Sequence, residues 1–123
     1  MLNRFQIFGK NAETVAARAL KKNGYRILEK NFKTREGEID IIAMDGDALV
    51  FVEVKARASG TAGSPKEAVT WQKQKRISKA AQYYLKTQKA ETARSRFDVV
   101  AITYSGASEP SIEIIRNAFE CPV

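Results

Sequence analysis

Two charged residues lie in the most apolar part of the chain, and their types could support hydrolytic chemistry. Glu53 and Lys55 are two residues apart in a run, residues 48–55, that is otherwise apolar. In an extended strand, residues two apart project from the same face. A carboxylate and an ammonium on such a strand are costly when buried, unless a partner charge or a metal ion compensates them.

A third charged residue, Asp40, lies in the preceding β-branched run. The dipeptide Asp45-Gly46 between the two runs is a strong hairpin signal. If it forms a two-residue loop, Asp40 pairs with Phe51 and becomes a diagonal neighbour of Glu53, with about 7–8 Å between the two backbones. The two carboxylates then share one face and lie close enough to bind the same divalent cation.

Oxygen ligands favour hard cations, and Mg²⁺ or Mn²⁺ binds one or two carboxylates while keeping several waters. A neighbouring ammonium such as that of Lys55 can orient an attacking water or stabilise charge on a phosphate. Asp40, Glu53, Lys55 and a metal ion would therefore suffice for hydrolysis of a phosphodiester. The competing interpretation is a structural salt bridge among the same three residues.

Composition narrows the chemistry further. The 123 residues include no histidine, which excludes Ser-His-Asp and Cys-His catalysis and any zinc site with a histidine ligand. The single cysteine, Cys121, can form neither an internal disulfide nor a cysteine metal cluster. No apolar stretch reaches the length of about 18 residues that a membrane-spanning helix needs. These features predict a cytoplasmic protein without a membrane partner.

Periodicity and turn signals predict the elements that position these residues. One α/β domain is expected over residues 1–117, with a short tail at 118–123 and a central mixed sheet of about five strands flanked by helices, in the order α-β-β-β-α-β-β. Gly24 ends the first helix as a left-handed cap, and Ser64-Pro65 begins the second. The helices are predicted at Arg4–Lys22 and from Ser64 to about Lys86, and the strands at Tyr25–Phe32, Glu38–Met44, Ala48–Lys55, Phe97–Thr103 and Ile112–Ile115.

The two runs that carry these charges, GEIDIIA at residues 37–43 and VFVEVKAR at residues 50–57, resemble the PD-(D/E)XK nuclease motif. Asp40 matches the first acid, Glu53 the second acid, and Lys55 the lysine. Ile39 stands where the motif often has proline. Over nearly its whole length the chain resembles the YraN-like family of small bacterial endonuclease-like proteins. This resemblance implies a restriction-endonuclease-like fold similar to that of archaeal Holliday-junction resolvases.

The resemblance adds further candidates for the site. In resolvase-like relatives an acid on the first helix joins the metal site, which points to Glu13, although a solvated glutamate at the helix edge is the alternative. The Val54 carbonyl is a further candidate metal ligand. Lys73 falls in the middle of the apolar stripe of the second helix, so it must either extend to solvent or pair with a carboxylate. Gln74 would lie at the edge of the same site.

Positive charge is concentrated in one segment. The chain carries 21 Lys and Arg against 14 Asp and Glu, a net charge of +7, and residues 66–96 contain nine basic residues but only two acids. A basic face beside a candidate metal site favours contacts to a phosphate backbone over a merely solvated surface. The residues predicted to contact nucleic acid are Arg57, Lys73, Gln74, Lys75, Arg76 and Lys79.

Other polar and aromatic residues of this segment favour structural roles. Arg96 and Asp98 flank Phe97 at a strand start, which is typical of an ion pair that sets the position of the strand. Trp71 points away from the apolar stripe; it could stack on a base, but a packing aromatic is the favoured interpretation.

Two functional hypotheses follow. The first is a Mg²⁺- or Mn²⁺-dependent endonuclease that binds structured or nonspecific DNA, and a homodimer is compatible with it because many nucleases of this fold act as dimers. The second is a non-catalytic DNA- or RNA-binding adaptor of the same fold that acts through a protein partner. Binding to anionic lipid is disfavoured, because the apolar stripe of the basic helix is needed for the core.

Overall fold

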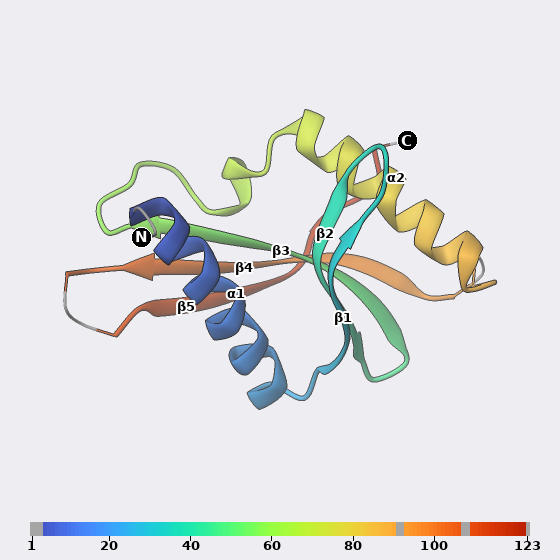
Figure 1. Ribbon diagram of the computed structural model, residues 1–123, viewed down its shortest axis with the longest axis horizontal. Helices are drawn as coiled ribbons and strands as arrows, with labels where there is room; N and C mark the ends of the chain where they lie inside the picture. Colours follow the sequence, from blue (N-terminus) through green and yellow to red (C-terminus); the bar gives the residue numbers. More distant parts are fainter. Residues whose placement is uncertain (1–3, 91–92, 107–108, 123) are drawn as a thin grey trace.

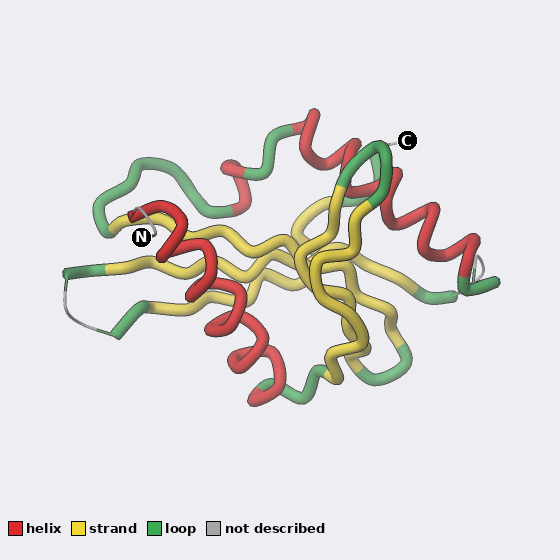
Figure 2. The backbone as a smooth tube through the Cα atoms, in the orientation of Figure 1, coloured by secondary structure: helices red, strands yellow, loops and turns green. Residues whose placement is uncertain are grey.

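The computed structural model describes residues 4–90, 93–106 and 109–122, and side chains from residue 12 onward within these ranges. Figures 1 and 2 show a twisted sheet with a helix on each side and a long loop before the second helix. The predicted α/β class and order of elements are confirmed. The elements are α1 (Arg4–Lys22), β1 (Arg26–Lys33), β2 (Glu38–Asp45), β3 (Ala48–Ala58), a 3₁₀ turn η1 (Lys66–Ala68), α2 (Trp71–Thr87), β4 (Ser95–Tyr104) and β5 (Ser111–Phe119).

The five strands form one mixed sheet in the order β1-β2-β3-β4-β5. Strands β1–β2, β2–β3 and β4–β5 pair antiparallel, whereas β3 and β4 pair parallel and are connected through α2. Both faces of β3 are buried over residues 48–53, which explains its nearly continuous apolar sequence. The candidate residue Glu53 therefore lies in the middle strand of the sheet, at the end of its most buried part.

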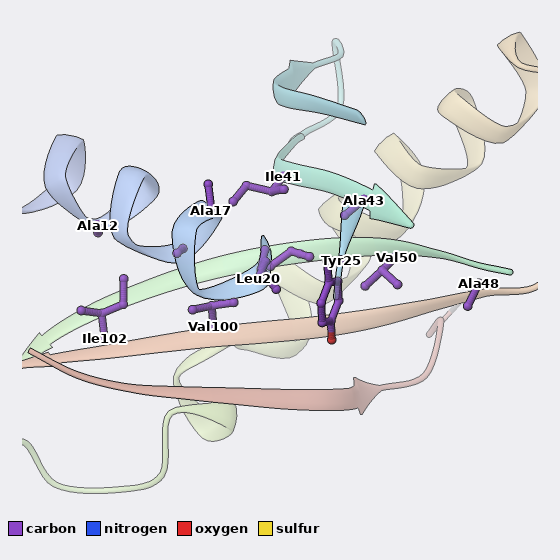
Figure 3. Packing of buried hydrophobic residues seen from close by; sticks show 12 residues of the cluster. Ala12, Ala17, Leu20, Tyr25, Ile41, Ala43, Ala48, Val50, Val100 and Ile102 are labelled. Carbon is purple, nitrogen blue, oxygen red and sulfur yellow. The ribbon is translucent and has the colours of Figure 1, made fainter. Parts of the chain in front are cut away.

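The two helices cover opposite faces of the sheet. On the α1 side, Leu20 and the alanines of α1 pack against residues such as Ile41, Val50 and Val52 (Figure 3). On the α2 side, residues including Ile77 and Tyr84 pack against others such as Ile42 and Phe51. Successive residues of β3 alternate between these two cores, as the pleat requires. Glu53 alternates with Val52 and so projects toward α2.

The first helix has the bounds predicted from its periodicity, and Gly24 has the left-handed φ of +88° expected of its cap. The N–H of Tyr25 donates to the carbonyl of Leu20 and closes the helix. Ala12 and Ala16 of the predicted apolar face are buried, together with Ala17 and Leu20. The predicted contributions of Phe5 and Phe8 lie outside the described side chains.

The hairpin register differs from the predicted one by two residues. The loop is Gly46-Asp47 rather than Asp45-Gly46, because Asp45 still pairs with Ala48. Gly46 has a φ of +61°, which a two-residue hairpin loop of the favoured handedness requires at its first position. The predicted pairing of Asp40 with Phe51 is therefore wrong. In a regular pair of strands, a shift of two residues does not change the face from which a side chain projects.

The second helix starts later than predicted. Pro65 precedes only the short turn η1, after which Val69 is extended. Thr70 then caps α2, and its side-chain oxygen accepts a hydrogen bond from the N–H of Lys73. A threonine hydroxyl supplies the acceptor that the first turn of a helix needs. This start moves the first turn of α2 to residues 71–74, so that Lys73 lies close to the sheet.

The last strand is longer than the predicted Ile112–Ile115, since β5 continues to Phe119. Ala118 is buried, and the ring of Phe119 stacks on that of Phe97 with 4.8 Å between centroids. A register shift between Phe97 and Val99 and a positive φ at Asn117 interrupt the hydrophobic alternation at this point. The strand predicted from the hydrophobic alternation therefore ended four residues before the observed one.

None of the helices in the described residues is both long and apolar enough to cross a membrane.

Candidate metal-binding active site

A row of polar residues crosses three neighbouring strands at one level. Counting along the observed registers places Asn31 of β1 opposite Asp40 of β2, and Asp40 opposite Glu53 of β3. The paired residues of β2 and β3 end at Ile41 and Val52, and Asp40 and Glu53 are the next residues along the two strands. The continued register therefore places the two acids closer together than the predicted diagonal register would.

The Asp40 carboxylate binds the edge of the neighbouring strand. Its Oδ2 accepts a hydrogen bond of 2.8 Å from the backbone N–H of Val54. The N–H and C=O of one strand residue point toward the same neighbouring strand. The Val54 carbonyl, a predicted ligand, therefore also points toward the side of β3 on which Asp40 lies.

Burial raises the pKa of Asp40 to about 7, and the charge of Glu53 adds to the rise, with a further contribution from Glu13. The Val54 hydrogen bond and the charge of Lys73 oppose the shift but do not cancel it. Two adjacent carboxylates in a poorly solvated place cannot both be ionised without cost. A cation bound beside the two carboxylates would offset this cost.

Glu53 is almost fully buried, and its charge is balanced from α2. Lys73 Nζ lies 2.8 Å from Glu53 Oε1, with the side chains 45% and 5% exposed respectively. Burial disfavours the charged form of Lys73, but the hydrogen bond and charge of Glu53, with Asp40 and Glu38, outweigh it and raise the lysine pKa. Of the two fates predicted for Lys73, pairing with a carboxylate is the one observed.

Lys55 lies on the same face as Glu53, about 7 Å further along the strand. It is half-buried, and within the described residues it forms no ion pair. The alternative of a salt bridge among Asp40, Glu53 and Lys55 is therefore not what the structure contains. Glu53 pairs with Lys73 and leaves the Lys55 ammonium available.

The other acids lie at the margin of the pair. Glu13 of α1 is half-buried, and its Oε2 accepts a hydrogen bond of 3.2 Å from Asn31 Nδ2. Sequence reasoning did not assign Asn31 to the site. Its φ of +54°, a conformation that asparagine tolerates better than most residues, turns the strand at this point. Glu38 is exposed, and its charge helps to raise the pKa of Lys73.

The donor set suits a hard cation. Asp40, Glu53 and the Val54 carbonyl offer only oxygen atoms, as Mg²⁺ and Mn²⁺ prefer. Among the residues that the structure describes, no three acidic, histidine or cysteine side chains form a ready-made metal cage. A cation would therefore bind Asp40 and Glu53 and retain several waters. Glu13 does not form a ready-made group of three ligands with these two residues.

The residues predicted to bind nucleic acid are not all equally available. Gln74 Nε2 donates to the Val69 carbonyl at 3.0 Å, and Arg57 Nη1 donates to the Gly63 carbonyl at 2.7 Å. Lys75 lies over the ring of Trp71, 4.6 Å from its centre, and Trp71 is 59% exposed. The exposed residues Arg76 and Lys79 lie further along α2, where Lys79 forms a loose ion pair of 3.7 Å with Glu36.

A second polar cluster is structural. Asp98 is fully buried and accepts four hydrogen bonds, two from Arg96 and one each from the Tyr25 hydroxyl and the backbone N–H of Asn117. Figure 3 shows the Tyr25 hydroxyl pointing away from α1. Burial, together with Asp98, raises the pKa of Tyr25 to about 12. The favoured interpretation of Arg96 and Asp98 as a positioning ion pair is confirmed.

Comparison with known proteins gives a family. Residues 12–102 match the model of "Uncharacterised protein family UPF0102". A UPF0102 protein of Geobacter metallireducens is 53% identical over 112 residues, which cover 91% of both chains. A UPF0102 protein of Desulfosudis oleivorans is 48% identical over 120 residues, which cover 98% of this chain and 95% of the other. The resemblance to the YraN-like family is thereby confirmed, and the chain belongs to the UPF0102 family.

Proposed function

We propose that this protein binds nucleic acid and hydrolyses phosphodiester bonds with Mg²⁺ or Mn²⁺, as a nuclease of the PD-(D/E)XK type. The observation that carries the proposal is the proximity of Asp40 and Glu53, two carboxylates in a poorly solvated place, where the charge of Glu53 helps to raise the pKa of Asp40. The presence of Lys55 on the same face, without a partner carboxylate in the described residues, supports it further.

In this mechanism Asp40 and Glu53 would hold the cation, and the Val54 carbonyl would supply a third oxygen. The bound cation would neutralise phosphate charge and lower the pKa of a coordinated water. Lys55 positions the attacking water, and its ammonium stabilises charge on the phosphate as the bond from phosphorus to the leaving oxygen breaks. Lys73 fixes the Glu53 carboxylate in place. DNA is the favoured substrate.

The test is a cleavage assay with Mg²⁺ and with Mn²⁺ on branched, flapped, single-stranded and duplex substrates. Glu53→Gln, which keeps the size of the side chain, should lose cleavage with every metal. Lys55→Ala should reduce the rate by about 10²-fold or more while binding persists, as expected when a positioned group acts in the transition state. Equal loss of binding and cleavage in Lys55→Ala would contradict its assigned role.

The second candidate is a non-catalytic nucleic-acid adaptor of the same fold. The observation that favours it is the 2.8 Å pair of Lys73 with Glu53, which already balances one of the two acids. Calorimetric titration with Mn²⁺ separates the candidates. The nuclease requires binding that Asp40→Asn weakens by at least about tenfold, because a neutral amide replaces a charged carboxylate ligand. Absence of binding, or equal binding by Asp40→Asn, would favour the adaptor.

A further inference from the structure

A groove runs between the turn that joins β1 to β2 and the second half of α2. Its volume is about 940 Å³, within the range of ligand-binding pockets, roughly 300–1,000 Å³. We call it the α2 groove; its walls are residues 33–36 of the turn and the side chains of Lys79, Gln82, Tyr83, Leu85 and Lys86. Figure 1 shows the turn passing beside the helix.

The α2 groove is strongly basic. Its described lining includes Lys33, Arg35, Lys79 and Lys86 but a single acid, Glu36. Glu36 forms a loose ion pair of 3.7 Å with Lys79, in which both side chains are about half exposed or more. Such exposed pairs are weak, so the groove keeps a clear surplus of positive charge. A polyanion is the partner that this surplus attracts.

An aromatic ring lies in the same groove. Tyr83 is 55% exposed, although its neighbour Tyr84 is buried in the core. The ring of Tyr83 lies 6.3 Å from that of Phe32 at an angle of 34°, so part of the ring packs against β1 while the rest faces the groove. An exposed aromatic ring among cations is the combination that binds single strands, because unpaired bases stack on the ring while cations contact the phosphates.

The geometry also connects the groove to the carboxylate pair. Glu38 lies near Lys73, Gly37 touches the backbone of Arg76, and Glu36 pairs with Lys79. The turn thus follows α2 step by step, away from the site. Lys79 lies about 9 Å beyond Lys73 along the helix axis, and Tyr83 about 15 Å beyond it. A strand in the groove would run toward Asp40 and Glu53.

From this arrangement we propose that the α2 groove binds an unpaired strand of nucleic acid, with a base stacked on Tyr83 and phosphates on Lys33, Lys79 and Lys86. Bases within a duplex are already stacked and offer no free face to the ring, so the groove selects unpaired segments. The inference deepens the proposed function: it makes substrates with a single-stranded segment beside the cleaved bond the preferred class.

The test measures binding without cleavage, in a chelator that removes divalent metal. Fluorescence anisotropy compares a labelled oligothymidine with a duplex of the same length. The wild type should prefer the oligothymidine. Tyr83→Ala should weaken its binding roughly tenfold and that of the duplex less than about twofold, because only the unpaired base loses its stacking partner. Tyr83→Phe, which keeps the ring, should bind as the wild type does.

Charge variants complete the experiment. Lys79→Ala and Lys86→Ala should each flatten the salt dependence of oligothymidine binding, because each removes one phosphate contact. Lys21→Ala removes the same charge from α1 on the other face of the sheet and should leave the salt dependence unchanged. An oligouridine probe separates DNA from RNA; binding of either strand that depends on Tyr83 supports the proposal.

Equal binding of single strand and duplex, or an unchanged affinity in Tyr83→Ala, would overturn the inference. So would displacement of the oligothymidine by polyglutamate, because displacement would identify the groove as a general anion surface. Because binding is measured without metal, the experiment tests the α2 groove independently of the proposed nuclease activity. Cleavage without Tyr83-dependent binding would refute the groove alone, and Tyr83-dependent binding without cleavage would refute the nuclease alone.

Discussion

At the scale of single residues, the candidate site depends on which partner each of its two carboxylates has. Lys73 is close to Glu53, whereas Asp40 is held by a neutral backbone N–H. The Lys73 ammonium therefore lies where a metal ion bound to the Glu53 carboxylate would lie. The lysine stabilises the metal-free protein, and it competes with a cation for the same carboxylate.

Replacement of Lys73 by methionine tests this balance. Lys73→Met keeps much of the apolar stem but leaves Glu53 buried without its partner, so it should lower the free energy of unfolding by about 1–2 kcal/mol in a chelator. This is less than the roughly 3–5 kcal/mol typical of broken buried pairs, because Lys73 is 45% exposed. Added Mn²⁺ should raise the melting temperature more in the variant than in the wild type.

Lys79→Met is the matched control. Lys79 is 46% exposed and lies on the same helix, but its partner Glu36 is 60% exposed. Its replacement should change stability by less than about 0.5 kcal/mol, since exposed pairs contribute little. If urea denaturation gave equal effects for the two variants, burial of Glu53 would not be the cause.

At the scale of the elements, the contact between the β1–β2 turn and α2 fixes both the site and the α2 groove. A Cβ atom on Gly37 would lie 2.5 Å from the carbonyl oxygen of Arg76. The turn is also closed on itself, because the N–H and carbonyl of Gly37 both bind Thr34. Glycine at this position lets the hairpin and the helix approach at backbone contact.

Gly37→Ala should separate these two elements. Relieving the clash means moving backbone, so we expect a loss of about 1–3 kcal/mol in the free energy of unfolding, as for overpacked cores. Amide hydrogen exchange should accelerate in α2. Gly46→Ala is the comparison: Gly46 also lies in a hairpin turn, but an added Cβ meets open space. It should lose stability through its positive φ yet leave exchange in α2 unchanged.

Sequence reasoning found the strands but not this contact. The apolar runs and the turn dipeptide predicted the two strands of the hairpin, but the predicted register was wrong by two residues. The need for glycine at position 37 could not be predicted from the sequence. Its φ is not in the left-handed region, and the steric constraint comes from a helix some forty residues away. The role of Asn31 was missed for a similar reason, since its partner Glu13 lies on another element.

At the scale of the whole molecule, the two sides of the sheet carry different clusters of polar residues. The α1 side contains the Tyr25–Asp98 network, which joins residues near the ends of β2, β4 and β5 to the start of β1. The α2 side carries the paired carboxylates and the basic groove. The sequence indicated the basic segment and the Arg96–Asp98 ion pair, but it did not indicate that Asp98 is fully buried and also binds Tyr25 and Asn117.

Asp98→Asn should show the cost of breaking that network. Asp98 is fully buried, and both of its carboxylate oxygens accept hydrogen bonds. An amide NH₂ in place of one oxygen would face these donors, and the substitution would remove one of the two carboxylates that pair with Arg96. We expect a loss of about 3 kcal/mol or more in urea denaturation. Asp47→Asn should cost less than about 0.5 kcal/mol, because Asp47 and its partner Arg94 are both largely exposed.

The hydrogen bond between Asp40 and the Val54 N–H gives the protein an internal spectroscopic probe. The nuclear magnetic resonance frequency of an amide proton follows the charge of its acceptor, so the Val54 signal reports the ionisation of Asp40. In metal-free protein it should titrate with a midpoint near pH 7, from the neutral acid below to the carboxylate above. The native pKa lies above the value of about 3.9 for an unfolded aspartate, so ionisation costs stability as the pH rises. A wild-type Val54 signal that stays constant from pH 5 to 9, or one that titrates in Asp40→Asn, would contradict this assignment.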